Sequence, residues 1–375
     1  MAGLYIHVPF RRASHAYEES YAIDVADTAV STFVTALQRE LRADARAFAA
    51  EEAITTIYAG GGRPSLLPLN RVHSILTTVV DVFDASSFEE GTAELNPADV
   101  TPRYVRGLKR MGFDRLSIPV LSFFPTDLQA LSAPHSAEAA IEALRMTRIT
   151  GFEDVSIDLL FGWPEQSFSN WRASLKLAVE LQVPHVTLIE ATESAGPVAD
   201  AETRADQLEF AMTFLQAEGY EQYELTHFAR PGHRSAHQEQ YYAHGNYLGL
   251  GPSAASFWWQ NRTRAAVGRR WTNVSDLREY ATLLDDGASP VAYRETLSPT
   301  ALAREYVLLR LRTTEGIDLD RLAAQYGIDL VDEHGALLDT LQERGLLHRA
   351  DRSVRLTNQG RLLADAIAQR LLPSD

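Results

Sequence analysis

The first two-thirds of the chain alternates short apolar runs with longer amphipathic stretches, and this alternation constrains the fold more than any other feature. The predicted strands are Leu4–Val8, Ile54–Ala59, Glu89–Glu94, Arg115–Val120, Asp154–Phe161, His185–Glu190 and Gln222–Phe228. The predicted helices are Ala26–Ala50, Asn70–Phe83, Pro97–Met111, Ser136–Ile149, Ser167–Leu181 and Glu202–Gly219. Because strands that alternate with helices favour a parallel sheet, we expect an α/β fold whose βα units bend into a partial barrel resembling the TIM barrel.

The pattern changes after Phe257, and we expect the barrel to occupy residues 1–257. Residues 258–297 are rich in arginine and asparagine and are predicted to be a connector. Residues 298–375 are predicted to form a helical, winged-helix-like domain. Its predicted elements are the helices Pro299–Arg312, Leu319–Tyr326 and Asp329–Arg344, a hairpin in Leu346–Leu356 and a last helix Asn358–Leu372.

The formal net charge of −15 disfavours binding to nucleic acid or to anionic membranes, which depends on basic residues. The third helix of the winged-helix-like domain carries Asp332, Glu333, Asp339 and Glu343, which oppose phosphate, so a structural cap is favoured over a DNA reader. No apolar run is long enough to cross a bilayer, and the first residues do not resemble a secretory signal. We therefore expect a cytoplasmic protein with no integral membrane segment and no nucleic-acid partner.

Polar or flexible residues fall at the predicted strand ends, where barrels carry function. Gly60, Gly61 and Gly62 follow the second predicted strand; they let backbone approach a ligand closely, or they simply form a tight turn. Glu94 could hydrogen-bond a ribose or an amine, or serve as the acid at a helix N-terminus. Asp158 lies between apolar residues and needs a polar partner, either in a ligand or in the protein.

The N-terminal run GLYIHVPF, residues 3–10, leads to Arg11, His15, Tyr17 and Glu18. It resembles the radical S-adenosylmethionine (SAM) proteins of the oxygen-independent coproporphyrinogen III oxidase and HemW-type heme chaperone group. In that group the motif C-x-x-x-C-x-Y-C follows and holds a 4Fe–4S cluster. Here Arg11, His15 and Glu18 stand at the three cysteine positions, and the chain has no cysteine at all. The resemblance therefore implies a degenerate member without the cluster, in which an Arg11–Glu18 ion pair fills the vacated position.

The resemblance extends to the SAM site. Residues 60–65, GGGRPS, are similar to the family's G-G-G-T-P-S, and Glu94 and Asp158 match two polar SAM contacts. Leu121 stands where the family has a glutamine, and Ala133 where it has an arginine. Because each lost buried partner costs about 1–3 kcal/mol, useful SAM affinity is not expected. We predict no catalytic residue, and no replacement metal, because His15 and Glu18 alone are too few ligands for zinc.

The best-preserved motif lies near His237. Residues 237–242, HQEQYY, resemble the family's H-N-x-x-Y-W, whose histidine is implicated in heme binding in HemW-type proteins. The resemblance implies His237 as an axial ligand of heme and Tyr241 as an aromatic neighbour. A hydrogen-bonding surface histidine is the plainer alternative. Three further histidines, His227, His233 and His244, lie close in the sequence.

Three functions stay open from the sequence. The first is a HemW-like protein that binds heme or a related tetrapyrrole and passes it to an acceptor protein, or regulates a partner, without radical catalysis. The second is an enzyme that keeps SAM or another nucleotide for non-radical chemistry through Glu94 and Asp158. The third is a structural partner protein that binds neither ligand.

Overall fold

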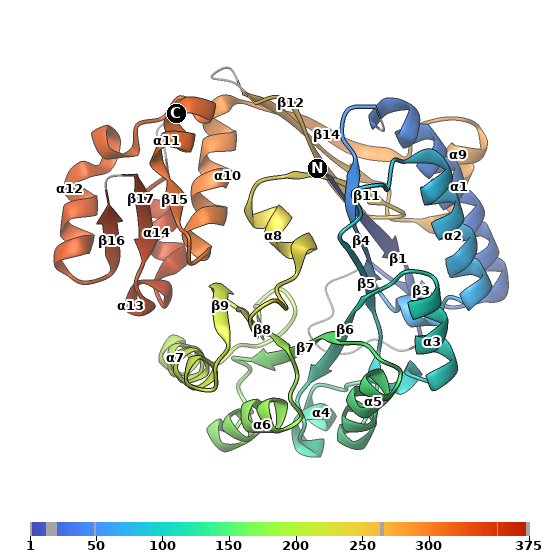
Figure 1. Cartoon of the computed structure of the whole chain (residues 1–375), viewed down its shortest axis with the longest axis horizontal. Helices are drawn as coiled ribbons and strands as arrows, with labels where there is room; N and C mark the ends of the chain where they lie inside the picture. Colours follow the sequence, from blue (N-terminus) through green and yellow to red (C-terminus); the bar gives the residue numbers. More distant parts are fainter. Residues whose placement is uncertain (1, 13–20, 49, 263–265, 351, 373–375) are drawn as a thin grey trace.

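A computed structural model of the chain describes residues 2–12, 21–48, 50–262, 266–350 and 352–372. A 12-stranded sheet forms an open arc rather than a closed barrel (Figure 1). From edge to edge its strands are β14 (Val291–Leu297), β13 (Val267–Asn273), β12 (Ala255–Asn261), β11 (Asn246–Leu250), β1 (Ala2–Val8), β4 (Ile54–Gly61), β5 (Glu90–Glu94), β6 (Arg115–Leu121), β7 (Asp154–Phe161), β8 (His185–Glu190), β10 (His227–Ala229) and β9 (Glu221–Glu224).

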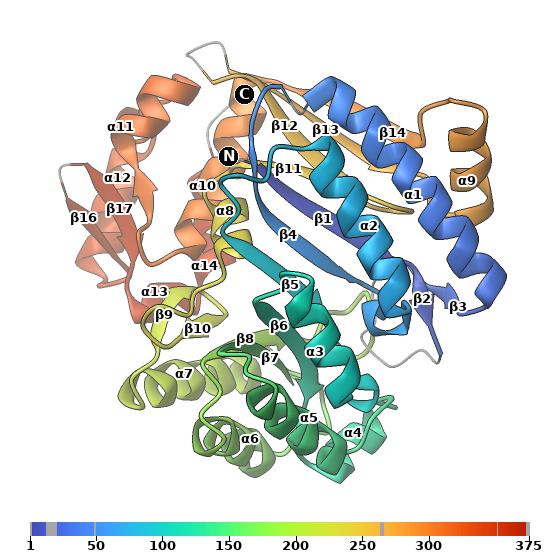
Figure 2. The same ribbon diagram turned by 45° about the vertical axis from the view of Figure 1, so that its right-hand side comes forward.

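The seven central strands, from β11 to β8, pair in parallel, and the strands at both edges pair antiparallel. Helices cover the convex face of the arc (Figures 1 and 2): α1 (Asp27–Phe48), α2 (Leu69–Val82), α3 (Pro102–Arg110), α5 (Ala137–Ile149), α6 (Phe168–Glu180) and α7 (Ala201–Ala217). Helix α1 shows why they pack there, because its buried residues Val30, Phe33, Val34, Leu37 and Leu41 recur at helical spacing. The predicted α/β partial barrel is thus confirmed.

The two faces of the central strands differ in chemistry. In β7, the residues Val155, Ile157 and Leu159 join the apolar core under the helices, whereas Asp154 and Asp158 alternate with them and face the other way. The same alternation places polar or ring-bearing side chains on the concave face of the neighbouring strands; these include Tyr5, His7, Thr56, Tyr58, Glu90, Thr92, Glu94, Arg115, Ser117, His185 and Thr187. Parallel strands in a plain structural sheet are apolar on both faces, so the concave face is the candidate site.

The segment 258–297, predicted to be a connector, instead forms most of β12 together with β13, helix α9 (Leu277–Asp285) and β14, which extend the sheet. Aromatic packing explains the difference. Trp258 and Trp271 are buried, and their ring centroids lie 4.8 and 5.5 Å from that of Phe48 in α1. The burial of these rings outweighs the polar composition of the segment.

Two further predicted elements are divided in the structure. Residues 222–228 form a tight β9–β10 hairpin, because the Glu224 carboxylate accepts the backbone N–H of Thr226 in the turn at 2.7 Å. The predicted helix 97–111 separates into η2 (Pro97–Asp99) and α3, since the residue before Pro102 is driven into extended backbone.

The C-terminal region contains α10 (Pro299–Arg312), α11 (Leu319–Arg321), α12 (Leu330–Glu343), α13 (Asn358–Arg361) and α14 (Ala364–Arg370). The hairpin β16 (Leu347–Ala350) and β17 (Ser353–Leu356) joins β15 (Ile317–Asp318) in a small sheet. Figure 1 places this region beside α8 (Ala236–Tyr242), on the open side of the arc. Among the described residues, no helix combines the length and the apolar character needed to span a membrane.

Candidate functional site

The glycine run at the end of β4, residues 60–62, packs closely against other parts of the chain. A Cβ on Gly61, whose φ is +103°, would lie 2.7 Å from the His7 ring. A Cβ on Gly60 would lie 2.7 Å from the Tyr58 ring and 2.9 Å from Glu94, and one on Gly62 would lie 2.5 Å from the carbonyl oxygen of Phe10. Internal packing therefore requires glycine at all three positions.

Arg63, which replaces the family's threonine, turns away from the glycines. Its guanidinium donates to the Asp99 carboxylate at 2.9 Å, and the Ser65 hydroxyl donates to the same oxygen at 2.7 Å. Both Arg63 and Asp99 have side chains less than one-tenth exposed. This buried ion pair ties the residues after β4 to η2.

The two carboxylates of the predicted SAM site lie on the concave face, and no ion pair joins Glu94 to a cationic side chain among the residues that the structure describes. Burial, and then the nearby charge of Asp158, raise the pKa of Glu94 to about 8. Burial also raises the pKa of Asp158 to about 6, although the charge of His227 and a hydrogen bond with Thr187 act in the other direction. At neutral pH the Glu94 carboxyl group therefore holds its proton.

Replacing Glu94 by glutamine is expected to stabilise the protein at alkaline pH. The pKa of Glu94 is about 8 in the folded protein and about 4.3 in an unfolded chain, so the wild-type protein loses stability as the pH rises between these values. Glutamine stays neutral, and because Glu94 is only half-buried by surface area we expect a gain of about 2 kcal/mol at pH 9 and little at pH 5. Thermal melting at both pH values measures it; an equal gain at the two would contradict this assignment.

The positions where the family's glutamine and arginine are lost lie in an apolar cluster. Leu121, which adopts the left-handed φ of +62°, packs with Leu131, Leu160 and Trp163, and Ala133 lies against the same cluster. Apolar side chains offer no donor or acceptor to the polar parts of SAM. Leu121 and Ala133, where the resemblance predicts a lost glutamine and a lost arginine, thus belong to a second small apolar core.

The remnant of the cluster loop is described only at its first position. The Arg11 guanidinium lies 3.9 Å from the Asp24 carboxylate, which is 88% exposed. His15 and Glu18, and with them the predicted Arg11–Glu18 ion pair, lie outside the described residues. Among the residues that are described, no group of three or more potential ligands could hold a metal ion.

His237 is buried in α8 and engaged at both ring nitrogens. Its Nδ1 lies 2.7 Å from the Thr56 hydroxyl and its Nε2 lies 2.9 Å from the Tyr241 hydroxyl. The ring stacks on Tyr58 at a centroid distance of 5.3 Å, only 1% of the residue is exposed, and burial lowers its pKa to about 3. The imidazole is neutral, and its lone pair is already used in a hydrogen bond. In this arrangement His237 does not fit axial ligation of heme.

The carboxylate of Glu90 on β5 holds the start of α8. It accepts the Ser235 hydroxyl at 2.9 Å, the Ala236 N–H at 2.8 Å and the His237 N–H at 3.2 Å. Arg115 lies 4.0 Å from the same carboxylate. An anion at the N-terminus of a helix satisfies the free N–H groups there, so Glu90 positions α8 against the concave face.

Reasoning from the sequence missed a polar cluster at the edge of the sheet. Glu224 is fully buried and accepts hydrogen bonds from His227 Nδ1 at 2.8 Å and from Arg312 Nε, on α10, at 2.7 Å. Burial alone would raise the pKa of Glu224, but His227, Arg312 and the N–H of Thr226 lower it to about 2. The cluster links the barrel to the C-terminal region. His227 lies only three residues from Glu224, but Arg312 lies 88 residues away, so a local pattern could not reveal the whole cluster.

The comparisons with known proteins agree with this architecture. A model described as the Radical SAM superfamily matches residues 28–178, and one described as the HemN C-terminal domain matches residues 297–363. A protein of Mycobacterium tuberculosis named heme chaperone HemW is 31% identical over 388 residues, which cover 99% of this chain and 94% of that protein. The chain belongs to the HemW family.

Other relatives support the same assignment. The heme chaperone HemW of Bacillus subtilis is 28% identical, and the alignment covers 98% of both chains. The solved structure of coproporphyrinogen III oxidase (HemN) from Escherichia coli, described as a radical SAM enzyme, aligns with a TM-score of 0.83 over 99% of this chain and 90% of that one. At 21% identity this match shows the fold alone. The predicted resemblance and the C-terminal domain are thereby confirmed.

Because the chain belongs to the HemW family, the residues at its cluster positions decide whether it can hold an iron–sulfur cluster. A 4Fe–4S centre of this kind is held by cysteine thiolates, and this HemW-family chain contains no cysteine. The guanidinium of Arg11 cannot supply a lone pair to iron. The residues present therefore do not fit the cluster.

Proposed function

We propose that this HemW-family protein binds heme and passes it to an acceptor protein, without an iron–sulfur cluster and without radical SAM chemistry. The observation that carries the proposal is the complete lack of cysteine in a chain that aligns end to end with proteins named heme chaperone HemW. The packing of His7, Tyr58 and Glu94 around the glycine run, and the apolar cluster at Leu121, also argue against SAM chemistry.

His237 stays the axial ligand that the motif predicts, and Tyr241 its aromatic neighbour, but the geometry sets a condition on ligation. Heme iron can reach His237 only if the hydrogen bond at the ligating nitrogen, to Thr56 or to Tyr241, breaks and α8 moves so that the buried ring is exposed. Glu90 opposes that movement through three hydrogen bonds to the start of α8. A cytoplasmic location, an acceptor protein as partner and the lack of a nucleic-acid partner remain predictions from the sequence.

Heme binding is tested by titrating hemin into the purified protein and recording the Soret band. We expect a saturable shift away from the spectrum of free hemin, at the same hemin concentration before and after treatment with an iron chelator that strips iron–sulfur clusters. Protein-bound spectra in both samples support cluster-independent binding. A spectrum of free hemin throughout the titration would remove the heme-binding proposal.

The second candidate, a SAM- or nucleotide-binding enzyme, rests on the survival of Glu94 and Asp158 on the concave face. We expect millimolar SAM to leave the melting temperature unchanged, because Leu121 and Ala133 supply no polar contact. Differential scanning fluorimetry with and without SAM measures this. A concentration-dependent rise in melting temperature would favour the second candidate, and no response to either SAM or hemin would favour the structural partner.

A further inference from the structure

Arg115, on β6, is a buried cation beside the carboxylate that holds α8. It is 3% exposed, its Nε lies 4.0 Å from the Glu90 carboxylate, and its Nη1 lies 4.0 Å from that of Asp154. Both separations are about 1 Å longer than a hydrogen bond. Its Nη2 is buried, and no residue in the described part of the chain accepts a hydrogen bond from it. A buried donor without a partner is costly, so Arg115 keeps a donor that only another arrangement would use.

Glu90 is engaged elsewhere in the present arrangement. Its carboxylate accepts the Ser235 hydroxyl and the N–H groups of Ala236 and His237 at the start of α8. Because Glu90 is 6% exposed, a movement of α8 would leave its charge buried without these donors. Arg115 can replace them, since a shift of about 1 Å would bring the carboxylate within hydrogen-bond distance of the guanidinium.

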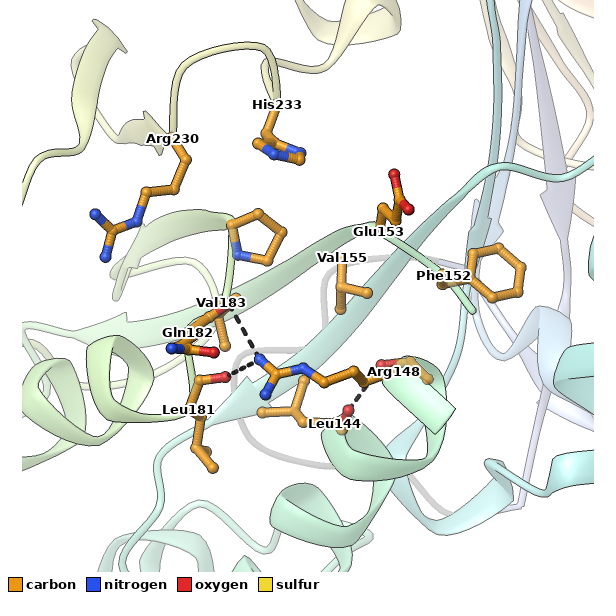
Figure 3. Close-up of a pocket in the computed structure, with 12 residues that line it drawn as sticks. Leu144, Arg148, Phe152, Glu153, Val155, Leu181, Gln182, Val183, Arg230 and His233 are labelled. Carbon is orange, nitrogen blue, oxygen red and sulfur yellow. Dashed lines mark hydrogen bonds between the residues drawn. The ribbon is translucent and has the colours of Figure 1, made fainter. Parts of the chain in front are cut away.

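The segment that carries α8 is anchored at both ends. His233 bonds Asp154 through its ring Nδ1 at 2.5 Å, and its carbonyl oxygen accepts from Arg115 at 3.1 Å. Figure 3 shows His233 at the edge of an open pocket of about 410 Å³, so polar contacts rather than close packing hold it. At the other end, the buried ring of His244 bonds the Tyr326 hydroxyl at 2.9 Å. The residues between His233 and His244 are therefore the part that can move.

An open pocket of about 420 Å³ beside α8 gives this segment space. Residues of the helix and of β4 line it, among them Ala236, Glu239, Gln240, Thr55 and Thr56. Thr56 is also the partner of His237 Nδ1. A shift of the start of α8 into this space would break its bonds to Glu90 and separate His237 from β4, which exposes the imidazole.

We propose that Glu90 exchanges partners, holding α8 while the helix is closed and pairing with Arg115 when it opens, and that this exchange sets how often His237 is exposed to heme. The inference rests on the proposed function, with α8 as the place where heme binds. A ligand that binds only the open form has its affinity reduced in proportion to the open fraction. Contacts of the closed form therefore weaken heme binding, and contacts of the open form strengthen it.

The test compares two variants of the full chain that are expected to act in opposite directions in stopped-flow hemin binding. Ser235→Ala removes one bond of the closed form, and we expect hemin to bind about tenfold faster and more tightly than to wild type. Arg115→Gln removes the partner of the open form, and we expect binding about fivefold slower and weaker. If Arg115 and Ser235 merely supported α8, both variants would loosen it and speed binding.

Two further variants complete the design. Ser136→Ala is the matched control, because Ser136 caps α5 as Ser235 caps α8 but has no bond to Glu90. It is expected to bind hemin like wild type. Arg115→Lys keeps the charge without Nη2 and is expected to fall between wild type and Arg115→Gln. The lysine variant tests the exchange if the glutamine protein does not fold.

Hydrogen exchange of the Ala236 and His237 amides, measured without hemin, reads the open fraction independently of heme. We expect faster exchange in Ser235→Ala and slower exchange in Arg115→Gln. Changes in the same direction in both variants, or no change in either, would overturn the exchange of partners. Opposite changes in a protein that gives only the spectrum of free hemin would remove the proposed function and leave the movement of α8 standing.

Discussion

Replacing Arg312 by methionine is expected to lower the free energy of unfolding by about 2–4 kcal/mol. Its partner Glu224 is fully buried, and the pair joins α10 to the barrel at 2.7 Å. Removing one member of a buried ion pair leaves the other charge without compensation. The remaining hydrogen bonds from His227 and Thr226, and the partial exposure of Arg312, keep the loss below the largest values for such pairs.

Arg349→Met is the matched control, because the Arg349 side chain is as exposed as that of Arg312, at 32%, but its partner Asp339 is 61% exposed. An exposed ion pair contributes about 0–1 kcal/mol, so its loss is expected to be small. Urea unfolding at neutral pH measures both variants. Equal losses in the two would contradict the role given to Glu224.

The Arg312→Met effect should also depend on pH in a defined direction. Glu224 has a folded pKa of about 2, below its unfolded value of about 4.3, so its contribution is present above the unfolded value and is lost as the pH falls through about 2. The difference between wild type and variant is therefore expected to shrink towards pH 2.

Glu40→Ala is expected to cost about 3 kcal/mol or more of stability. Glu40 on α1 is 3% exposed and accepts the hydroxyl of Tyr280, the N–H of Gly251 at 2.8 Å and the side-chain amide of Asn273 at 2.6 Å. Alanine leaves these buried donors unpaired, and each unpaired buried group costs about 1–3 kcal/mol. The loss would be read from the urea unfolding midpoint, and Trp258 fluorescence is a suitable probe of unfolding because its ring is buried against Phe48 of α1.

Glu40→Gln supplies the control of equal size. Burial, and then the charge of Asp44, raise the pKa of Glu40, which disfavours its charged form, so a neutral amide of the same size is expected to be tolerated better than alanine. The Oδ1 atom of Asn273 has no hydrogen-bond partner among the described residues and can receive the new N–H. We expect the glutamine variant to lose less than half as much stability as the alanine variant. A glutamine variant as unstable as the alanine one would show that size, not hydrogen bonding, sets the cost.

The parallel core was predictable because its signal is local. Strands Asp154–Phe161 and His185–Glu190, and helix Pro299–Arg312, have the bounds that the apolar patterns indicated. The segment 258–297 was not predictable in this way, since its strands depend on Trp258 and Trp271 meeting Phe48, a contact between distant parts of the chain. Local composition there is polar, and packing decided the outcome.

Some residues of the candidate site could likewise be predicted from local sequence, and others could not. Gly60, Glu94 and Asp158 could be singled out because each lies at a strand end or within an apolar run. The hydrogen bonding of His237 could not be predicted, because its partner Thr56 lies 181 residues away in the sequence. The hydrogen bond between His233 and Asp154 could not be predicted either, because these residues are 79 positions apart. A motif names a histidine, but only the fold shows which of its nitrogens is available.

The most direct test of the proposal that this HemW-family protein holds no iron–sulfur cluster is its content of iron and acid-labile sulfide after anaerobic reconstitution with iron and sulfide. The lack of any cysteine predicts no bound sulfide and no cleavage of SAM by the reconstituted protein. Stoichiometric iron and sulfide, together with cleavage of SAM, would contradict the account.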